Sequence, residues 1–310
     1  MKILAPAKIN LFLEITGKKK TGQGTYHTLN TIFQTVNLCD EIVISPGKSH
    51  RIDFTCDWTK IGIAESSPVE DNLCFRAASA LMEYLEEKKG ARIKLVKKIP
   101  AGAGLGGGSS DAAAVLIGLL KFWNRKIDKK NLNEIALKLG ADVPFFLYGG
   151  CCFAQGVGEK LTPLRTSWEK EPLNIVLVKP GFSKSTGDVY KRYDERAVKR
   201  LTKFNNIPKI KREKLVDLNS LKLVNSLEEV VFEKYPELKA LKCNFINMGA
   251  CASLMSGSGT TIFGVFENGL IAQKSFVEFK KNGFNAWLIH TLNGGALWKS
   301  QKLEFPRGKK

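Results

Sequence analysis

The chain has few histidines and no paired cysteine motif. Its three histidines are scattered, and its seven cysteines are odd in number and include no CxxC pair. A zinc site needs clustered His and Cys ligands, and a disulfide framework needs an even set of cysteines. The sequence therefore argues against a His-rich metal site and against a disulfide-stabilised secreted domain.

Long apolar runs are also missing. No apolar stretch reaches the roughly 18 residues that a membrane-spanning helix needs. The N-terminal stretch MKILAPAKINLFLEI is interrupted by Pro6, Lys8 and Asn10, which is unlike the apolar core of a signal peptide. We therefore expect a cytoplasmic protein with no membrane partner.

What the chain has in excess is positive charge. Its 310 residues are 44% apolar, enough for two packed domains, and carry a formal net charge of +18. Such a charge favours anionic partners, although the Lys- and Arg-rich segment 191–214 is typical of a solvated surface. Its aromatic residues do not alternate with the basic ones in the pattern of an RNA-stacking platform, so we do not expect a nucleic-acid partner.

Hydrophobic patterning predicts a mixture of strands and helices. Period-two alternation and short apolar runs predict strands at 3–15, 40–45, 51–56, 91–100, 173–181 and 284–292. Helical spacing predicts helices at 70–90, 109–124, 128–140 and 270–283, and a basic helical stretch at 188–235. We expect a hairpin-like loop at 16–29, a strand and turn at 151–164, and a Gly/Ser loop that leads into a strand at 251–266. The change in character after residue 157 places a domain boundary near 157–165.

Several residues mark where the predicted helices begin and end. Asp71 or Asn72 can cap the first helix and Gly90 ends it, while Asp128 and Gly140 bound the third.

The densest glycine segment, IPAGAGLGGGSSDAAA at 99–114, allows three interpretations as a phosphate-binding loop. Gly102, Gly104 and Gly107 fit GxGxxG, but this loop does not follow the first strand, as a dinucleotide-binding fold requires. The spacing also fits Walker A, but Gly108 stands where that motif has its lysine. The third interpretation needs only backbone N–H groups and a helix N-terminus that together surround an anion.

Two serines follow these glycines. Ser109 and Ser110 can cap the next helix, bond a phosphate oxygen or bind Mg²⁺. The alternative is that the glycines merely allow close helix packing, which would not need so many of them beside paired serines.

Lys8 and Asp142 are candidate catalytic residues, each with a plain structural alternative. Lys8 lies in a mostly apolar strand, where it either reaches the strand edge or meets an anion. Asp142, in LGADVPFF, lies between a helix end and an apolar stretch, and either acts chemically or makes a turn or cap.

Taken together, the motifs PAKINLFLEITG, YHTL, IPAGAGLGGGSSDAA, LGADVPFFLYGG, GVGEKLTPL and LMSGSGTTIFGVF occur in an order that resembles the GHMP small-molecule kinase superfamily. PAKINLFL, YHTL and GADVPFF narrow the resemblance to a member of the non-mevalonate route to isoprenoid precursors. Such an enzyme phosphorylates the 2-hydroxyl of a polyol that carries a cytidine diphosphate.

The resemblance implies roles for particular residues and requires ATP and Mg²⁺. Asp142 would accept the proton of the acceptor hydroxyl, and Lys8 would lie beside it and favour the alkoxide. The ATP phosphates would be bound by Pro100, Ala101, Gly102, Ala103, Gly104, Leu105, Gly106, Gly107, Gly108, Ser109 and Ser110. The substrate would be bound by Asn10, Tyr26, His27, Thr186 and Tyr190. Among these, Tyr26 and Tyr190 would sandwich cytosine and His27 would bond its polar edge. No metal ligand is assigned beyond Ser109 or Ser110 as a Mg²⁺ ligand, and loop 256–259 would close the site.

The same resemblance implies a two-domain α+β fold and leaves alternatives open. Residues 1–160 would form a domain like domain 2 of ribosomal protein S5, and residues 161–310 a ferredoxin-like domain. We expect a monomer or a homodimer. The alternatives are another GHMP kinase with a different alcohol acceptor, or a basic RNA-binding protein on an S5-like fold. Thr25 is an insertion relative to the family pattern next to Tyr26, and 191–214 has no assigned role.

Overall fold

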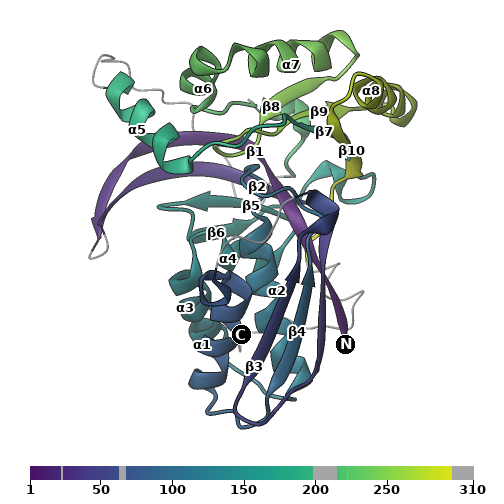
Figure 1. Cartoon of the computed structure of the whole chain (residues 1–310). Helices are drawn as coiled ribbons and strands as arrows, with labels where there is room; N and C mark the ends of the chain where they lie inside the picture. The colour runs from purple at the N-terminus through teal and green to yellow at the C-terminus, as the bar shows by residue number, and fades with distance from the viewer. Residues whose placement is uncertain (22–23, 63–67, 198–214, 222, 295–310) are drawn as a thin grey trace.

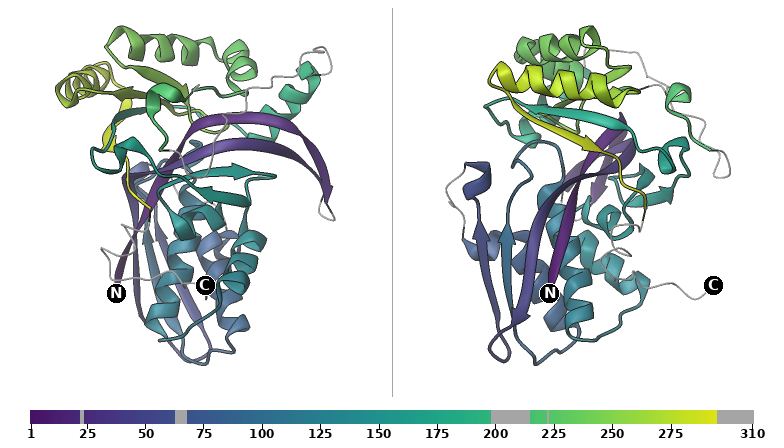
Figure 2. Two further views of the ribbon diagram at one scale, coloured as in Figure 1. Left: turned by 180° about the vertical axis from the view of Figure 1, so that it is seen from behind. Right: turned by 90° about the vertical axis from the view of Figure 1, so that its right-hand side faces the viewer.

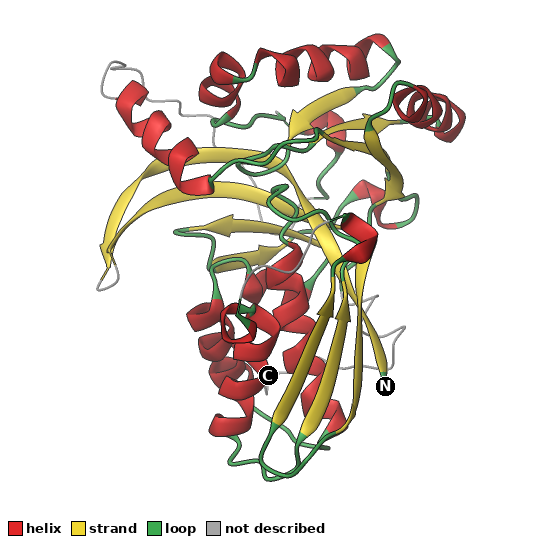
Figure 3. Ribbon diagram, viewed as in Figure 1, coloured by secondary structure: helices red, strands yellow, loops and turns green. Residues whose placement is uncertain are grey.

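The computed structural model describes residues 1–21, 24–62, 68–197, 215–221 and 223–294. Its strands form a six-stranded and a four-stranded sheet, stacked as two layers (Figure 1). Helices α1 to α4 pack against one face of the first sheet, and α6, α7 and α8 cover the outer side of the second (Figures 1 and 2). Colouring by secondary structure shows the same grouping, with one set of helices beside the long strands of the lower half and another set over the upper sheet (Figure 3). This confirms the predicted α+β fold class.

The first sheet has the order β3-β4-β2-β5-β6, and β1 pairs with β2 outside this path. Its strands are β1 (Lys2–Thr21), β2 (Gly24–Pro46), β3 (Ile52–Asp57), β4 (Ala91–Val96), β5 (Cys151–Gln155) and β6 (Lys160–Pro163). The strands pair in antiparallel fashion except β3 and β4, which are parallel and are joined through α1.

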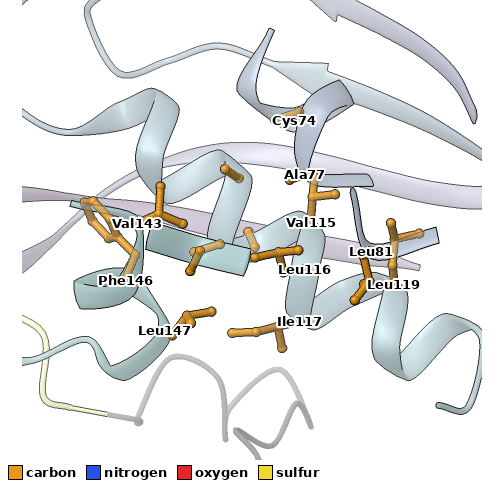
Figure 4. Packing of buried hydrophobic residues seen from close by; sticks show 14 of the residues in the cluster. Cys74, Ala77, Leu81, Val115, Leu116, Ile117, Leu119, Val143, Phe146 and Leu147 are labelled. Carbon is orange, nitrogen blue, oxygen red and sulfur yellow. The ribbon is translucent and has the colours of Figure 1, made fainter. Parts of the chain in front are cut away.

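The core of this half lies between the sheet and its helices. The helices are α1 (Leu73–Tyr84), α2 (Gly107–Phe122), α3 (Lys129–Leu139) and α4 (Val143–Tyr148). Helix α2 is apolar on nearly every face and is buried from Ser110 to Leu120. Leu81 of α1, Leu119 of α2 and Phe146 of α4 belong to one cluster around it (Figure 4). A helix that is apolar all round needs such a central position.

The second sheet has the order β10-β7-β9-β8, and all its described pairings are antiparallel. Its elements are β7 (Asn174–Lys179), α5 (Thr186–Ala197), α6 (Glu228–Lys234), α7 (Pro236–Asn247), β8 (Ala252–Met255), β9 (Ile262–Phe266), α8 (Gly269–Lys281) and β10 (Asn285–His290). Along the chain, these elements follow the order strand, helices, two strands, helix, strand. When the four strands are numbered in chain order, they lie side by side in the order 4-1-3-2. This is a ferredoxin-like arrangement, as the resemblance implied.

Short 3₁₀ helices lie between these elements, at Thr59–Ile61, Val69–Asp71, Ser167–Glu169 and Leu218–Ser220. Within the described residues, we find no helix with both the length and the apolar character needed to cross a membrane.

A long hairpin of β1 and β2 connects the two layers and extends past them beneath α5 (Figures 1 and 2). Ile9 and Leu11 of β1 share a buried cluster with Leu177 of β7 and Val265 of β9. Farther along the hairpin, Leu13 bonds to the backbone near Asn225. The hairpin therefore belongs to both cores.

Several boundaries differ from the sequence-based expectations. The loop expected at 16–29 was wrong, because β1 continues to Thr21 and β2 begins at Gly24. The hydrogen bonds between the two strands override the low strand propensity of the lysines and glycines there.

The first helix, capped by Asn72 as predicted, ends at Tyr84 rather than at Gly90. A Cβ atom at Gly90 would lie 1.6 Å from the carbonyl oxygen of Lys48, so this glycine serves a close backbone approach.

The start of α2 is a second correction. Ser109 and Ser110 do not cap it, because Gly106 is the N-cap residue in the left-handed region at φ 69° and the helix begins at Gly107. Asp128 does cap α3 by accepting from the N–H of Asn131, and Gly140 ends that helix.

The remaining differences concern helices. The six-residue α4 and the whole of α7 were not predicted. The basic stretch 188–235 is helical only in α5, a 3₁₀ turn and α6, and its part 198–214 lies outside the described residues.

Candidate active site

A cleft of about 1220 Å³ opens between the hairpin, the glycine loop and α5. It collects most of the candidate residues that the sequence indicated, although they come from distant parts of the chain. The lining includes Lys8, Asn10, Tyr26, His27, Gly104, Gly106, Asp142, Thr186, Tyr190, Gly257 and Ser258. The substrate-side and catalytic candidates therefore share one cavity with part of the glycine loop.

The glycine loop reaches this cleft through a series of left-handed turns. Gly102, Gly104 and Gly106 have φ values of 61°, 75° and 69°, which L side chains rarely adopt. Between them, the side chains of Ala103 and Leu105 are buried in the core. Alternation of inward apolar residues with left-handed glycines fixes the loop and brings its backbone to the cleft surface, at the N-terminus of α2.

The second Gly/Ser loop, 256–259, packs directly on the first. The Ser256 hydroxyl donates to the carbonyl oxygen of Gly104 at 3.0 Å. A Cβ atom at Gly104 would lie 2.1 Å from the carbonyl oxygen of Ser256. Nearby, the hydroxyls of Ser258 and Thr186 are 3.0 Å apart. The two glycine loops and the start of α5 therefore form one continuous wall.

Lys8 and Asp142 meet in the cleft. Lys8 Nζ lies 3.8 Å from Asp142 Oδ2, and the side chains are 5% and 33% exposed. Asp142 occupies the N-cap position of α4 but makes no capping hydrogen bond with its side chain. For Lys8, the structure therefore favours a buried cation that faces an anion over an exposed lysine at a strand edge. For Asp142, it favours a carboxylate that is available to the cleft over one that caps a helix.

A chain of hydrogen bonds fixes the Lys8 ammonium from its other side. Lys8 Nζ donates to Asn10 Oδ1 at 2.7 Å, and Asn10 Nδ2 donates to the Thr31 hydroxyl at 2.8 Å. The Thr31 hydroxyl donates in turn to the carbonyl oxygen of Phe12 at 2.6 Å. Asn10 is 1% exposed, so it positions Lys8 in addition to lining the cleft.

Burial lowers the pKa of Lys8 below its usual value of 10.5, and the Asp142 carboxylate opposes this effect only in part. Desolvation disfavours the charged form of an amine, whereas a nearby carboxylate favours it. The Lys8 ammonium therefore loses its proton at a lower pH than that of a surface lysine does.

At the hairpin tip, β1 and β2 place Lys18 opposite His27 and Lys19 opposite Tyr26. The His27 ring lies against Tyr190 of α5, with centroids 4.7 Å apart and planes inclined by 31°. Tyr26 is 43% exposed and lines the same part of the cleft.

Asp194 of α5 fixes this end of the cleft. Its carboxylate lies 2.7 Å from both His27 Nε2 and Lys18 Nζ. Burial of Asp194 opposes its ionisation, but the hydrogen bonds from Lys18 and His27 outweigh this and lower its pKa. Burial and the Asp142 carboxylate also raise the pKa of the nearby Tyr190 phenol to about 12.

Sequence reasoning missed Asp194 because it lies in a segment whose composition is typical of a basic solvated surface.

Sequence reasoning also missed a buried ionic cluster behind the glycine loop. Lys97 donates to Asp40 and, at 2.7 Å, to Asp111 in the first turns of α2. Burial of Lys97 opposes its charge, but the two carboxylates outweigh this and raise its pKa, while burial raises the pKa of Asp111 to about 8. In the sequence, the only signal for this ionic cluster was a lysine at the end of an apolar strand.

The serines after the loop differ in accessibility. Ser110 is fully buried, and its hydroxyl oxygen has no hydrogen-bond partner among the described residues. Ser109 is less buried, and its hydroxyl oxygen lies 4.0 Å from where a Cβ of Gly140 would be, two residues before Asp142. Hydroxyl oxygen suits Mg²⁺, and of the pair Ser109 is the more accessible.

Comparisons with known proteins agree with this geometry. Residues 72–150 match the family model of the GHMP kinases N terminal domain, and residues 207–282 match that of the GHMP kinases C terminal region. The chain is 40% identical over 295 residues to the 4-diphosphocytidyl-2-C-methyl-D-erythritol kinase of Citrifermentans bemidjiense, covering 94% of this chain and 99% of the relative.

Solved structures give the same result. A crystal structure of 4-(cytidine 5'-diphospho)-2C-methyl-D-erythritol kinase is 36% identical and superposes with a TM-score of 0.76, covering 95% of this chain and 100% of that one. The mevalonate kinase of Methanococcus jannaschii, at 15% identity and a TM-score of 0.67, covers 94% of this chain and 98% of its own, and shares the fold.

Proposed function

Since the chain belongs to the GHMP kinase family, and within it to the 4-diphosphocytidyl-2-C-methyl-D-erythritol kinases, we propose that it phosphorylates the 2-hydroxyl of 4-diphosphocytidyl-2-C-methyl-D-erythritol with ATP. This is the kinase step of the methylerythritol phosphate route to isoprenoid precursors. The observation that carries the proposal is the Lys8–Asp142 pair, 3.8 Å apart, in the cleft that the glycine loop enters.

On the donor side, the ATP phosphates are bound by loop 100–110. Its left-handed glycines leave the backbone uncovered, and the first turn of α2 supplies unpaired N–H groups and the positive end of the helix dipole. No side chain in this loop carries a positive charge, so backbone dipoles hold the phosphates. Ser109 would help to hold Mg²⁺ beside the phosphates, and the ion would supply neutralisation of the transferring phosphoryl group.

In the chemical step, the Asp142 carboxylate accepts the proton of the substrate 2-hydroxyl. The hydroxyl oxygen forms a bond to the terminal phosphorus of ATP, and the bond from that phosphorus to the bridging oxygen breaks, which releases ADP. The Lys8 ammonium stabilises the negative charge that develops on the attacking oxygen. Asn10 and Thr31 hold Lys8 in place throughout, so no reorganisation is needed as the charge appears.

On the acceptor side, cytosine stacks on Tyr26 and Tyr190 at the hairpin tip. His27 Nε2 is already bonded to Asp194, which leaves Nδ1 and the backbone of His27 for the polar edge of the base. Thr186, beside Ser258, faces the substrate where α5 meets the second glycine loop. This arrangement separates the base, at the hairpin tip, from the reacting hydroxyl beside Asp142.

The broader organisation follows from the same proposal. Residues 1–160 form the domain that carries the phosphate loop and the Lys8–Asp142 pair, and residues 161–310 form the domain that closes the cleft. The division falls close to the start of β6, and the hairpin binds both parts. A cytoplasmic location and a monomeric or homodimeric state complete the proposal.

A coupled assay of ADP release across alcohols tests the acceptor. We expect turnover with the cytidyl substrate, and none above the no-acceptor background with mevalonate or homoserine. Faster turnover with one of those alcohols would transfer the proposal to another GHMP kinase activity. No specific observation favours that alternative or an RNA-binding role.

A further inference from the structure

A second, smaller cavity lies behind the wall of the cleft. It has a volume of about 230 Å³ and lies between segment 183–185, the first turns of α5 and the junction of α6 with α7. None of the residues that line it also lines the large cleft. Its polar lining consists of Ser183, Lys184, Ser185, Asp188, Arg192, Lys234 and Tyr235.

Positive charge dominates this lining. Lys184, Arg192 and Lys234 carry cations, and Asp188 is the one carboxylate that the described lining contributes. No ion pair within the described part of the chain joins any of these three cations to a carboxylate. Arg196, one turn along α5 from Arg192, is in contrast paired with two glutamates of α6.

Lys184 is the most unusual member. Its Nζ atom is inaccessible to solvent and has no hydrogen-bond partner among the described residues. Burial, with a smaller effect from Lys234, lowers the pKa of Lys184 to about 7. A buried ammonium without a partner is costly, and an anion beside it would remove that cost. None of the steps of phosphoryl transfer uses this group.

We propose that this cavity is a second anion site, for a small oxyanion of the phosphate class. Lysine, arginine and serine hydroxyls are phosphate-binding groups, and Ser183 and Ser185 stand beside the cations. The volume is below the roughly 300 Å³ at which pockets for drug-sized ligands begin, so a whole nucleotide does not fit. The occupant is therefore a free phosphate ion or the phosphoryl end of a metabolite that extends into solvent.

The site lies against both glycine loops of the cleft. A Cβ atom at Gly102 would be 3.5 Å from the Ser183 side chain, and one at Gly259 would be 3.2 Å from Lys184 Cε. Thr186, which follows this segment, bonds Ser258. An anion in the cavity thus orders the segment that supports the wall between the two sites.

Titration of inorganic phosphate into the whole enzyme, saturated with a non-hydrolysable ATP analogue, tests the proposal by calorimetry. The analogue occupies the glycine loop, which removes the ATP-phosphate site from the titration, and the Lys184 and Arg192 variants then assign the remaining binding to the second cavity. We expect one phosphate per chain in the wild type. The dissociation constant should rise by about tenfold in Lys184→Met and in Arg192→Gln, as expected for the loss of one charge-assisted hydrogen bond. Lys274→Met, on the exposed face of α8, is the matched control and should bind as the wild type does.

The same titration with methyl phosphate distinguishes the sources. Tighter binding of methyl phosphate supports a phosphomonoester as the occupant, and tighter binding of inorganic phosphate supports the free ion. The proposal is overturned if analogue-saturated wild type binds neither, or if Arg192→Gln, whose side chain is exposed and not needed for folding, binds phosphate as tightly as the wild type. Because binding is measured without the acceptor, the result does not depend on whether the cytidyl alcohol is the substrate.

Discussion

Replacement of Lys8 by methionine removes the buried cation and nearly preserves its volume. The side chain is 5% exposed, and its surroundings include the Phe33 ring, 5.1 Å from Nζ, so an unbranched apolar chain fits there. Asp142 is one-third exposed and stays solvated in the variant, which allows the protein to fold. The perturbation is therefore mainly electrostatic.

Its magnitude follows from the geometry. Two unit charges separated by 3.8 Å interact by about 4 kcal/mol at an effective dielectric constant of about 20. The charge that develops on the attacking oxygen is partial, and water reaches the Asp142 side, so about 2–4 kcal/mol of transition-state stabilisation is at stake. We expect kcat of Lys8→Met to fall by about 30- to 1000-fold.

Steady-state kinetics by coupled ADP release, with both substrates varied, measure this effect. KM for ATP should change by no more than a few-fold, because the glycine loop is untouched. Lys2→Met is the matched control: it lies on the same strand, is 58% exposed and forms a surface ion pair with Glu41, so it should behave as the wild type. A kcat within threefold of the wild type in Lys8→Met would refute an electrostatic role for Lys8.

The pH dependence gives a second check on the same residue. Burial lowers the pKa of Lys8, and the protonated form is the one proposed to act. Wild-type kcat should therefore fall as the pH rises through this lowered pKa, at a pH below 10.5. The decline should be absent from the residual activity of Lys8→Met. Persistence of the same alkaline decline in the variant would assign it to another group.

Other variants test separate parts of the site. Asp142→Asn should lower kcat by about 10²- to 10⁴-fold with ATP binding retained in calorimetry, and retained turnover would exclude Asp142 as the base. Tyr26→Ala should mainly raise KM for the cytidyl substrate, and an unchanged KM would contradict base stacking. Gly104→Ala places a methyl group 2.1 Å from the Ser256 carbonyl oxygen at φ 75°, so it should lower Tm in thermal denaturation and raise KM for ATP. Lys97→Met leaves two buried aspartates without their cation and should cost about 3 kcal/mol in urea denaturation, while a loss below 1 kcal/mol would count against the cluster.

Local features of the fold could be predicted from the sequence because their signals are local. Asn72 and Asp128 were identified as caps from residue type and position, and both accept the expected backbone hydrogen bonds. The glycine loop before α2 was found in the same way. Its helix start was misplaced by two residues, because the N-cap position is held by Gly106 in the left-handed region, without a side-chain cap, rather than by a serine.

Long-range features had no such signal. Strand propensity gave no reason to extend the hairpin through KKKT and GTY, where pairing between the strands decides the conformation. The contact of Lys8 with Asp142 depends on how β1 and α4 pack, and only resemblance to known kinases indicated it. Asp194 shows the same limit, since an acidic residue in a basic segment becomes informative only when α5 is placed against the hairpin tip.

The most direct test of the central claim is the identity of the phosphorylated product. Purified enzyme should be incubated with ATP, Mg²⁺ and 4-diphosphocytidyl-2-C-methyl-D-erythritol, and the product analysed by ³¹P and ¹³C NMR. The proposed function predicts a new phosphomonoester signal coupled to carbon 2 of the methylerythritol, equal in amount to the ADP formed, and formed at least about 100-fold more slowly with Asp142→Asn. A phosphoryl group on any other oxygen, or ADP release without a new phosphomonoester, would contradict it.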